Sequence, residues 1–339
     1  MEKLLQSILT KNAIATNDKD YFVVNPYYRN IDGELSSTFE GLQKLWTGKR
    51  MMTSFQWIES NKRMRYYCLT MEDGNTIVGK VYFKDNKISY LYEALFEENK
   101  KRYFCEISYD GTLFEGYQKQ VNKRTVQGEI EGALEEIFKE KVRVHASGRT
   151  DKGVHAYRQT LHFDLDTKIP LKRMRMIMNQ YFPEDIYCRH IVEKPQVFHA
   201  RYDTVFKTYM YHLDFGEFDV MKRNYRWYVK TFDLARFKDS LNSVVGEHDF
   251  ASFTKTTEKD TRRTIFGVDI EVEDKQVKVF ISGDGFLRYM VRNIIMAAYL
   301  IARKEVNYTM EDLLLAKDNT ILRQMADPTG LYLFEVGYE

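Results

Sequence analysis

An aspartate, an arginine and two glycines stand close together in one ten-residue stretch, Ser147–Ala156, which reads S-G-R-T-D-K-G-V-H-A. An ionised carboxylate such as that of Asp151 can act as the nucleophile in covalent catalysis. Burial under a substrate raises the pKa of a carboxyl group, whereas an arginine beside it lowers that pKa by ~1–3 units. An isolated D-x-G is more often a turn capped by its own aspartate, so the stretch by itself is only a candidate nucleophile loop.

Strand-like sequences flank this stretch on both sides. Residues 141–145 alternate polar and apolar side chains, and apolar residues recur at every second position from Leu161 to Leu165. This alternation is typical of half-buried strands. We therefore expect Asp151 to lie in a tight loop where two strands end, with Gly148 and Gly153 permitting backbone angles that a side chain would forbid.

The elements that must position this loop follow the order β-α-β-β-α-β. Thr125 can cap a helix whose apolar stripe runs from Val126 to Phe138, and a second helix is expected at 171–180. The predicted strands are at 103–109, 141–145, 161–165 and 186–192. This order is that of the ferredoxin-like split unit, which RNA-recognition modules share.

A second set of elements follows in approximately the same order. The pattern predicts strands at 207–213, 265–272, 277–282 and 331–336, and helices at 234–245, 286–302 and 310–316. Alternation places Lys207, Tyr209 and Tyr211 on one face of their strand. The apolar stripe of helix 286–302 turns Arg288 and Arg292, four residues apart, together toward another face. We expect an α+β protein with two ferredoxin-like halves, 103–200 and 201–339, whose antiparallel sheets surround a central cleft.

Residues 1–97 read as a separate small α+β domain. Short helices are expected at 4–9 and 39–46, followed by strands at 51–57, 64–71, 76–83 and 88–95 that are separated by turn residues. This pattern resembles the cone-shaped domain of the ketosteroid-isomerase and nuclear-transport-factor type. This resemblance assigns no chemistry to the domain. The domain could serve dimerisation, grip the substrate or bind a small ligand, or it could be a fusion without a coupled function.

Composition excludes several classes of protein. With 44% hydrophobic and 29% charged residues, the 339-residue chain is typical of soluble globular proteins and not of disordered ones. No apolar run is long enough for a membrane span, and no signal peptide is visible. Three distant cysteines without C-x-x-C spacing fit reduced thiols in the cytoplasm. The net charge is only +2, although Lys119–Lys230 holds 21 basic against 15 acidic residues, a weak indication of RNA binding.

The stretch around Asp151 resembles the G-R-T-D-x-G-V-H-A signature of the TruA family of tRNA pseudouridine synthases. The other pseudouridine synthase families have Leu at the position of Thr150, so the match also selects the family. The resemblance extends over residues 103–336. Matching blocks stand at 109–111, 114–118, 124–127, 198–201, 207–211, 246–253, 263–265, 285–293 and 330–333. Tyr117 is a slight departure, because Trp or Phe is commoner there.

This resemblance implies roles for particular residues. Asp151 would be the nucleophile, Arg292 its ion-pair partner, Arg149 the wedge that replaces the flipped base, and Tyr209 the residue that stacks on the uracil and could act as general base. The resemblance places substrate contacts at Gln118, Lys119, Lys123, Arg124, Arg201, Phe286 and Arg288. No cofactor and no metal are expected. The partners would be tRNA, at its anticodon stem-loop (positions 38–40) and elbow, and a second copy of the chain in a cytoplasmic homodimer.

Two other functions remain open at this point. The fold would also suit a catalytically silent tRNA-binding module, although such a module has no reason to keep Asp151, Arg292 and Tyr209 together. A metal-dependent hydrolase using Asp151 and nearby histidines is the second alternative, but no H-x-E, H-E-x-x-H or cysteine pair supports it. Whether the aspartate would attack C1′ of the ribose or C6 of the uracil is likewise undecided.

Overall fold

The computed structural model describes five strands of the amino-terminal region and residues 99–338, except 197 and 256–259. By its contacts the chain divides into two units: residues 1–104, 162–171 and 191–199 form the first, and residues 105–161, 172–190 and 200–339 form the second. Among the described residues, no helix is long and apolar enough to cross a membrane.

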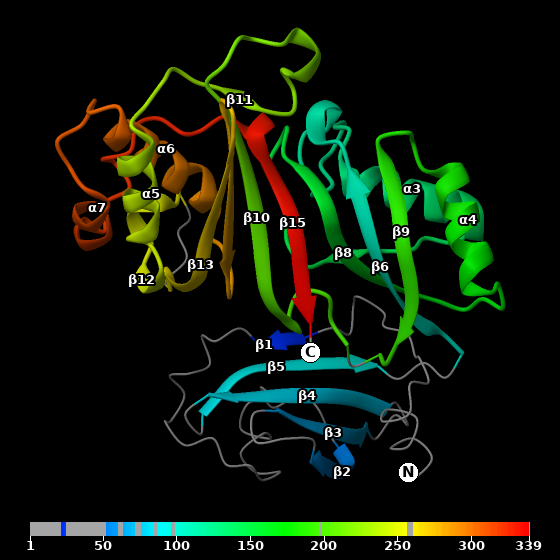
Figure 1. The fold of residues 1–339 in the computed structure, drawn as a ribbon. Coiled ribbons are helices and arrows are strands. Elements are labelled where there is room, and N and C mark those ends of the chain that lie inside the picture. The colour runs from blue at the N-terminus through cyan, green and yellow to red at the C-terminus, as the bar shows by residue number, and fades with distance from the viewer. Residues whose placement is uncertain are drawn as a thin grey trace. The chain divides into compact units, whose positions relative to one another are not determined.

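The first unit contains a five-stranded antiparallel sheet in the order β1-β5-β4-β3-β2 (Figure 1). These strands are β1 (Phe22–Val24), β2 (Met52–Glu59), β3 (Met64–Met71), β4 (Thr76–Lys84) and β5 (Lys87–Leu95). The four strands predicted here are present, and β1 is an additional one. The helices predicted at 4–9 and 39–46 lie outside the described residues, so the resemblance to a cone-shaped domain stays a prediction.

One ten-stranded sheet runs through the rest of the chain in the order β12-β13-β14-β10-β15-β8-β6-β9, with short β11 and β7 paired beside β10 and β8. Its strands are β6 (Lys101–Tyr109), β7 (His145–Ala146), β8 (His155–Leu165), β9 (Ile186–Lys194), β10 (Thr204–Asp214), β11 (Trp227–Tyr228), β12 (Gly246–Asp249), β13 (Arg262–Glu273), β14 (Gln276–Gly283) and β15 (Leu331–Tyr338). The predicted α+β class is confirmed. The strands of the two halves join into a single sheet, because β15 pairs with β8 in parallel through Tyr332 and His155.

Helices follow the predicted order in each half: α3 (Val126–Phe138), α4 (Leu171–Tyr181), α5 (Leu234–Asn242), α6 (Met290–Ala302) and α7 (Met310–Ala316). Thr125 caps α3 as expected, since its side chain accepts a hydrogen bond from the Gly128 N–H. The strand predicted at 141–145 is wrong in extent, because only His145 and Ala146 pair with β8.

The long helix α6 begins four residues later than predicted. Tyr289 takes a left-handed conformation with φ +66°, so the helix starts at Met290 and Arg288 lies outside it. The prediction that Arg288 and Arg292 share a face of this helix is therefore wrong. The helix is also buried on almost every side rather than along one stripe, which is typical of a core helix. Arg292 is thus a charged residue inside the core of the second half.

Candidate active site

The loop Ser147–Gly153, called here the Asp151 loop, is held at its first two residues by hydrogen bonds to the neighbouring strand β8. The Ser147 N–H donates to the Thr160 carbonyl at 2.9 Å, and the Gln159 amide donates to the Gly148 carbonyl at 3.0 Å. Gln159 also accepts from the Ser147 hydroxyl at 3.0 Å. Because Gln159 and Thr160 belong to β8, the sheet itself fixes where the loop begins.

A second group of contacts fixes the residue before the aspartate. The Thr150 hydroxyl is 2.7 Å from the Tyr109 hydroxyl, and the Tyr117 N–H donates to the Thr150 carbonyl at 3.0 Å. Gly116, with φ +100°, lies so close that a Cβ there would come within 3.0 Å of that same carbonyl oxygen. The backbone at Thr150 is therefore clamped from two sides, and Asp151 projects from a rigid support.

Asp151 and Arg292 form an ion pair across 141 residues of sequence. Arg292 Nη1 lies 3.5 Å from Asp151 Oδ2, and Arg292 Nε donates to the Ala326 carbonyl at 2.7 Å. The arginine side chain is 10% exposed and that of the aspartate 26%, so solvent or a substrate reaches the carboxylate more easily than its partner. The arginine is oriented by a main-chain acceptor and presents its guanidinium to the aspartate.

The environment of Asp151 acts on its pKa in opposite directions. Burial raises the pKa of this carboxyl, whereas the charges of Arg292 and Arg288 lower it, and the net effect is a pKa above the usual value. The arginine therefore offsets only part of the effect of burial. An ionised Asp151 is consequently less stable than an aspartate in water, which favours a reactive nucleophile.

Tyr209 comes from β10, next to β14 and β15, and contacts Phe286 edge to face with ring centroids 5.0 Å apart. Burial, together with the nearby Tyr109 and Asp151, raises the pKa of Tyr209 far above its ordinary value. The hydroxyl therefore stays protonated at neutral pH. Tyr209 and Phe286, two residues predicted separately, form one aromatic corner beside the Asp151 loop.

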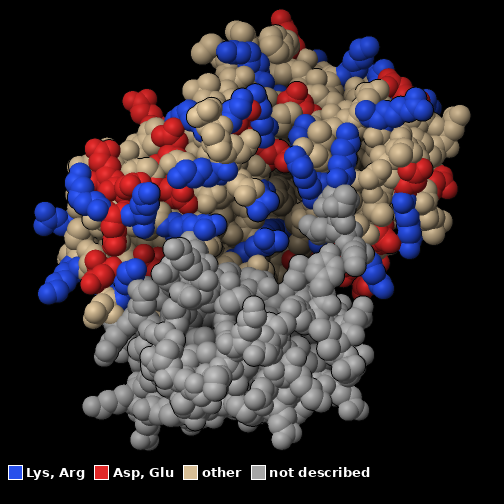
Figure 2. All heavy atoms as spheres, turned by 180° about the vertical axis from the view of Figure 1, so that it is seen from behind, with Lys and Arg blue, Asp and Glu red and all other residues tan. Residues whose placement is uncertain are grey.

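Most of the remaining predicted residues lie at the surface. Arg149, Gln118, Lys119, Lys123, Arg201 and Arg288 are exposed. Lys119 pairs with Glu131 at 3.0 Å, and Arg288 donates to the Tyr289 hydroxyl at 2.6 Å. Figure 2 shows Lys and Arg side chains bordering a hollow near the middle of the coloured surface. A polyanion approaching such a surface meets exposed positive charge.

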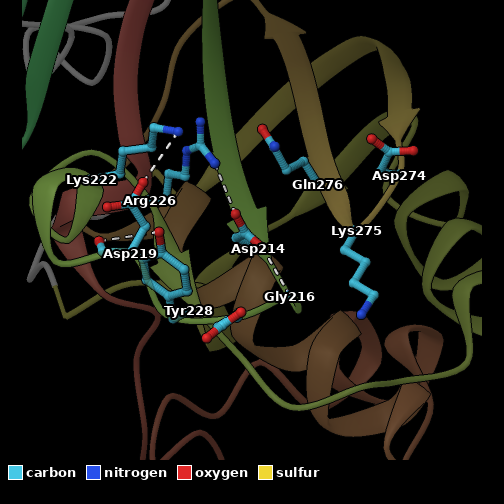
Figure 3. Close-up of a pocket in the computed structure, with 10 residues that line it drawn as sticks. Asp214, Gly216, Asp219, Lys222, Arg226, Tyr228, Asp274, Lys275 and Gln276 are labelled. Atoms are coloured by element: carbon cyan, nitrogen blue, oxygen red, sulfur yellow. Dashed lines mark hydrogen bonds and ion pairs between the residues drawn. The ribbon is translucent and has the colours of Figure 1, made fainter.

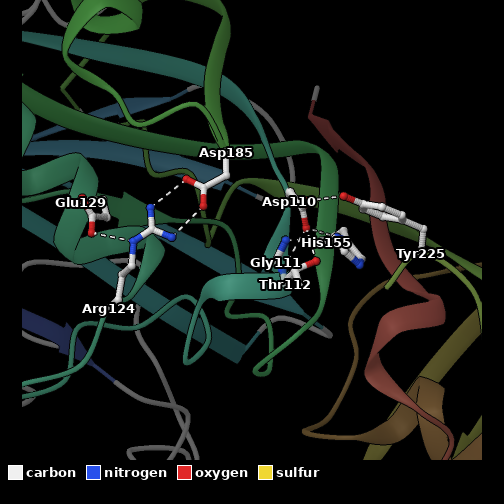
Figure 4. Close-up of polar contacts among 8 residues, drawn as sticks. All are labelled: Asp110, Gly111, Thr112, Arg124, Glu129, His155, Asp185 and Tyr225. Atoms are coloured by element: carbon white, nitrogen blue, oxygen red, sulfur yellow. Dashed lines mark hydrogen bonds and ion pairs between the residues drawn. The ribbon is translucent and has the colours of Figure 1, made fainter. Parts of the chain in front are cut away.

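Arg124 differs from the other basic residues because its guanidinium already has partners. It donates two hydrogen bonds to Asp185, at 2.7 and 2.9 Å, and one to Glu129 (Figure 4). The guanidinium also lies over the Phe114 ring at 4.3 Å. Such a bidentate pair fixes the Arg124 side chain in place.

Two residues of the site's surroundings were not singled out by sequence reasoning. Tyr289 has no sequence signal for its left-handed backbone, which is strained for a bulky residue and lies directly before α6.

Asp110 accepts hydrogen bonds from Thr112 and, at 2.6 Å, from the Tyr225 hydroxyl, beside the buried His155 (Figure 4). His155 contacts the Asn224 carbonyl at 2.8 Å. This cluster ties the end of the Asp151 motif to the 215–226 loop.

An enzyme that everts a nucleotide from RNA and attacks it with a carboxylate needs a nucleophile, an aromatic stacking surface and basic residues around them in one place. Comparison with known proteins identifies the family to which the chain belongs. The family model described as tRNA pseudouridine synthase matches residues 107–203 and 241–339. The chain therefore belongs to the tRNA pseudouridine synthase family.

Individual relatives agree with this assignment. Proteins named tRNA pseudouridine synthase A are 42% identical over 248 residues in Listeria welshimeri, 40% over 249 in a Geobacillus species and 38% over 243 in Mycoplasmoides gallisepticum. These matches cover 70% of this chain and, respectively, 99%, 99% and 92% of the relatives. Residues 1–106 lie outside the family model.

Proposed function

We propose that the protein converts uridine to pseudouridine in the anticodon stem-loop of tRNA, at positions 38–40, in the cytoplasm. Family membership supports this substrate class. The reaction breaks the bond between C1′ and N1 and joins C1′ to C5; the proton lost from C5 is balanced by one gained at N1. The reaction changes no oxidation state, so it requires no redox cofactor, and this proposal assigns it to an acid–base and nucleophilic site without a cofactor or metal. The observation that carries the proposal is the Asp151–Arg292 ion pair on a clamped loop.

Asp151 is the nucleophile in this proposal, and Arg292 is its partner. The 3.5 Å separation and the net raised pKa support a carboxylate that is ionised but poorly stabilised. Such a group gains stability when it forms a covalent bond to C1′ or C6. Arg149 enters the RNA stack in place of the everted base, a role that its exposure two residues before the nucleophile supports.

Tyr209 supplies the stacking surface for the everted uracil, with Phe286 against its edge. Base–aromatic stacking is worth ~1–3 kcal/mol, enough to offset much of a flipping cost of a few kcal/mol. Because its phenol is protonated at neutral pH, Tyr209 cannot take the C5 proton as a phenolate. As a base it could act only by passing on its own proton at the same time.

Gln118, Lys119, Lys123, Arg201 and Arg288 contact the tRNA backbone in this proposal, as far as the elbow. Their exposure supports that role. Arg124 would have to share its guanidinium with Asp185 and Glu129, so we assign it a smaller contribution. The halves 103–200 and 201–339 together form the synthase, and residues 1–97 form a separate domain.

Tritium release from tRNA labelled at uracil C5 tests the catalytic assignment. The intact chain should release tritium, and Asp151→Asn should release none above background. Asp269→Asn, which changes an exposed aspartate of β13, is the matched control and should behave as the unchanged chain. Equal release by Asp151→Asn and the unchanged chain would end the assignment, and binding without release by the unchanged chain would identify a silent tRNA-binding module.

The homodimer uses the other face of the sheet in this proposal. Met210 and His212, which alternate with Tyr209 and Tyr211, line a hollow of about 770 Å³ on that face. Its wall includes the aromatic residues Tyr157, Tyr187, Tyr225, Phe280, Tyr332 and Phe334. Tyr157 and Tyr187 are 44% and 53% exposed, and exposed aromatic clusters of this kind are typical of interfaces.

The loop 215–226 borders the same hollow and is held firmly. Asp214 accepts from the Gly216 N–H at 2.8 Å and from Arg226 at 2.9 Å, and Lys222 pairs with Asp219 (Figure 3). This frame presents Met221 to solvent, 77% exposed. A loop that is anchored in this way and exposes Met221 beside an aromatic hollow supports contact with a second copy.

Light scattering tests the dimer. The 40.4 kDa chain should run at twice its mass, and the double variant Tyr157→Arg/Tyr187→Arg should run as a monomer. Leu315→Arg changes a still more exposed apolar residue, in α7, and should leave the dimer intact. A monomeric unchanged chain, or a double variant that stays dimeric, would contradict this arrangement.

A further inference from the structure

Lys207 stands on the same strand face as Tyr209, two residues earlier in β10. At a rise of ~3.4 Å per residue, the two side chains leave the strand about 7 Å apart. This separation is within the reach of a single nucleotide. A base stacked on Tyr209 would therefore have its own backbone close to the lysine.

The Lys207 side chain crosses the start of the Asp151 loop. Its ammonium donates a hydrogen bond to the Ser147 carbonyl at 2.6 Å. A Cβ added at Gly148 would lie 3.0 Å from the Lys207 nitrogen, so the lysine tip fills the space that a side chain at Gly148 would need. The ammonium thus lies directly above the backbone that leads to Arg149 and Asp151.

This positive charge is poorly compensated. Among the described residues the Ser147 carbonyl is the hydrogen-bond partner of the ammonium, which has three donors. Burial lowers the pKa of Lys207 to about 8, and the charge of Arg201 acts in the same direction. A partly buried cation beside a second cation is stabilised by an anion that binds next to it.

Holding the loop does not require this charge. The loop is already attached to β8 by other hydrogen bonds: the Ser147 N–H and hydroxyl donate to Thr160 and Gln159, and the Gly148 carbonyl accepts from Gln159. A neutral donor would serve the Ser147 carbonyl equally well. The positive charge therefore calls for another explanation, and tRNA brings phosphates to this site.

We propose that Lys207 binds the backbone phosphate of the target uridine, with Arg201 strengthening the positive field, while the base of that nucleotide stacks on Tyr209. The phosphate contact places the everted nucleotide in register with the Asp151 loop, because the same ammonium touches the Ser147 carbonyl. Lys207 is in this sense a substrate-binding residue of the everted nucleotide itself. The inference rests on the proposed function, since it takes tRNA as the substrate.

Salt dependence of tRNA binding tests the phosphate contact. Dissociation constants would be measured over a range of salt concentrations in the Asp151→Asn background, so that no turnover occurs. Lys207→Met should weaken binding about tenfold and reduce the slope of log K against log salt by about 0.7–0.9, the value for one lost phosphate contact. Lys207→Arg should keep the slope, and Lys238→Met, which changes a half-buried lysine of α5, should change neither quantity. An unchanged slope in Lys207→Met would overturn the proposal.

A change in the RNA tests the same phosphate contact with the unchanged protein, so the result does not depend on whether the Lys207→Met variant folds. An anticodon stem-loop with one neutral methylphosphonate linkage at the target uridine should bind the protein with unchanged Lys207 about tenfold more weakly than the normal RNA. A methylphosphonate three linkages away serves as the control. If the neutral linkage at the target costs no affinity, Lys207 does not contact that phosphate. Tritium release by the intact chain reports on the proposed function separately, so the two failures are distinguishable.

Discussion

Asp151 lies 3.5 Å from the guanidinium of Arg292, yet the pKa of its carboxyl is higher than that of an aspartate in water. The two observations are compatible because burial acts more strongly than the ion pair. Keeping Asp151 ionised in this buried site therefore costs folding free energy. Loss of the carboxylate charge should therefore lower activity while raising the stability of the fold.

Replacing Arg292 by Gln should move the acidic limb of the activity profile to higher pH. Of the two arginine charges that lower the pKa of Asp151, the change removes the one with the larger effect, so the pKa rises. Only the ionised carboxylate attacks. Tritium release under single-turnover conditions should fall about 10- to 100-fold at neutral pH and recover in part as the pH rises. Arg288→Gln removes the charge that has the smaller effect on this pKa, so it should shift the acidic limb less. An acidic limb that stays in place in Arg292→Gln would contradict this account of the ion pair.

Asp151→Asn should stabilise the fold at neutral pH while abolishing activity. The folded-state pKa of this carboxyl is raised, so its ionisation costs stability above that pKa, and this cost disappears as the pH falls through it. The gain should appear as a higher free energy of unfolding at neutral pH, and it should vanish in acid. Urea unfolding at neutral and acidic pH measures both.

Asp249 provides a control of opposite sign for this stability measurement. Burial raises the pKa of Asp249, but hydrogen bonds from Thr261 and Lys317 more than offset that effect and hold the pKa below its ordinary value. Asp249→Asn should therefore destabilise the fold at neutral pH. If both asparagine variants change stability in the same direction, burial of the charge is not what distinguishes Asp151.

Local sequence signals predicted most of the elements around the site. Thr125 caps α3, α7 runs over the predicted residues 310–316, and strand alternation places Tyr209 and Tyr211 on one face of β10. Such signals extend over only a few residues, so they miss features that depend on distant contacts. The parallel pairing of β15 with β8, which joins the two halves into one sheet, has no local signal.

The later start of α6 has the same kind of cause. Periodicity continues through Leu287 and Val291, so the pattern predicts a helix from Phe286. The structure interrupts it with the left-handed Tyr289, whose neighbour Arg288 is held through its carbonyl by the Thr254 hydroxyl at 2.9 Å. The juxtaposition of Asp151 and Arg292, which no local pattern reveals, was accessible only through resemblance to a family.

Tyr209→Phe and Tyr209→Leu should separate stacking from the hydroxyl. The phenylalanine keeps the aromatic face beside Phe286, so binding of tRNA in the Asp151→Asn background should be unchanged. The leucine loses stacking worth ~1–3 kcal/mol, which corresponds to a roughly 5- to 150-fold weaker binding. Equal affinities for the two variants would show that the uracil does not stack on this residue.

Two glycines that line the Asp151 loop should respond differently to alanine. At Gly116 an added Cβ meets the backbone carbonyl of Thr150 at 3.0 Å, and φ is +100°, which L residues rarely adopt. At Gly148 the added Cβ meets only the tip of the flexible Lys207 side chain, at 3.0 Å. Gly116→Ala should thus displace the residue that carries the nucleophile, costing about 2 kcal/mol or more in stability together with most of the activity. Gly148→Ala should cost about 1 kcal/mol or less, because a lysine end can move aside whereas a clamped carbonyl cannot. Urea unfolding and tritium release on both variants measure these effects, and a reversed order would mean that the loop is anchored at Lys207 rather than at Thr150.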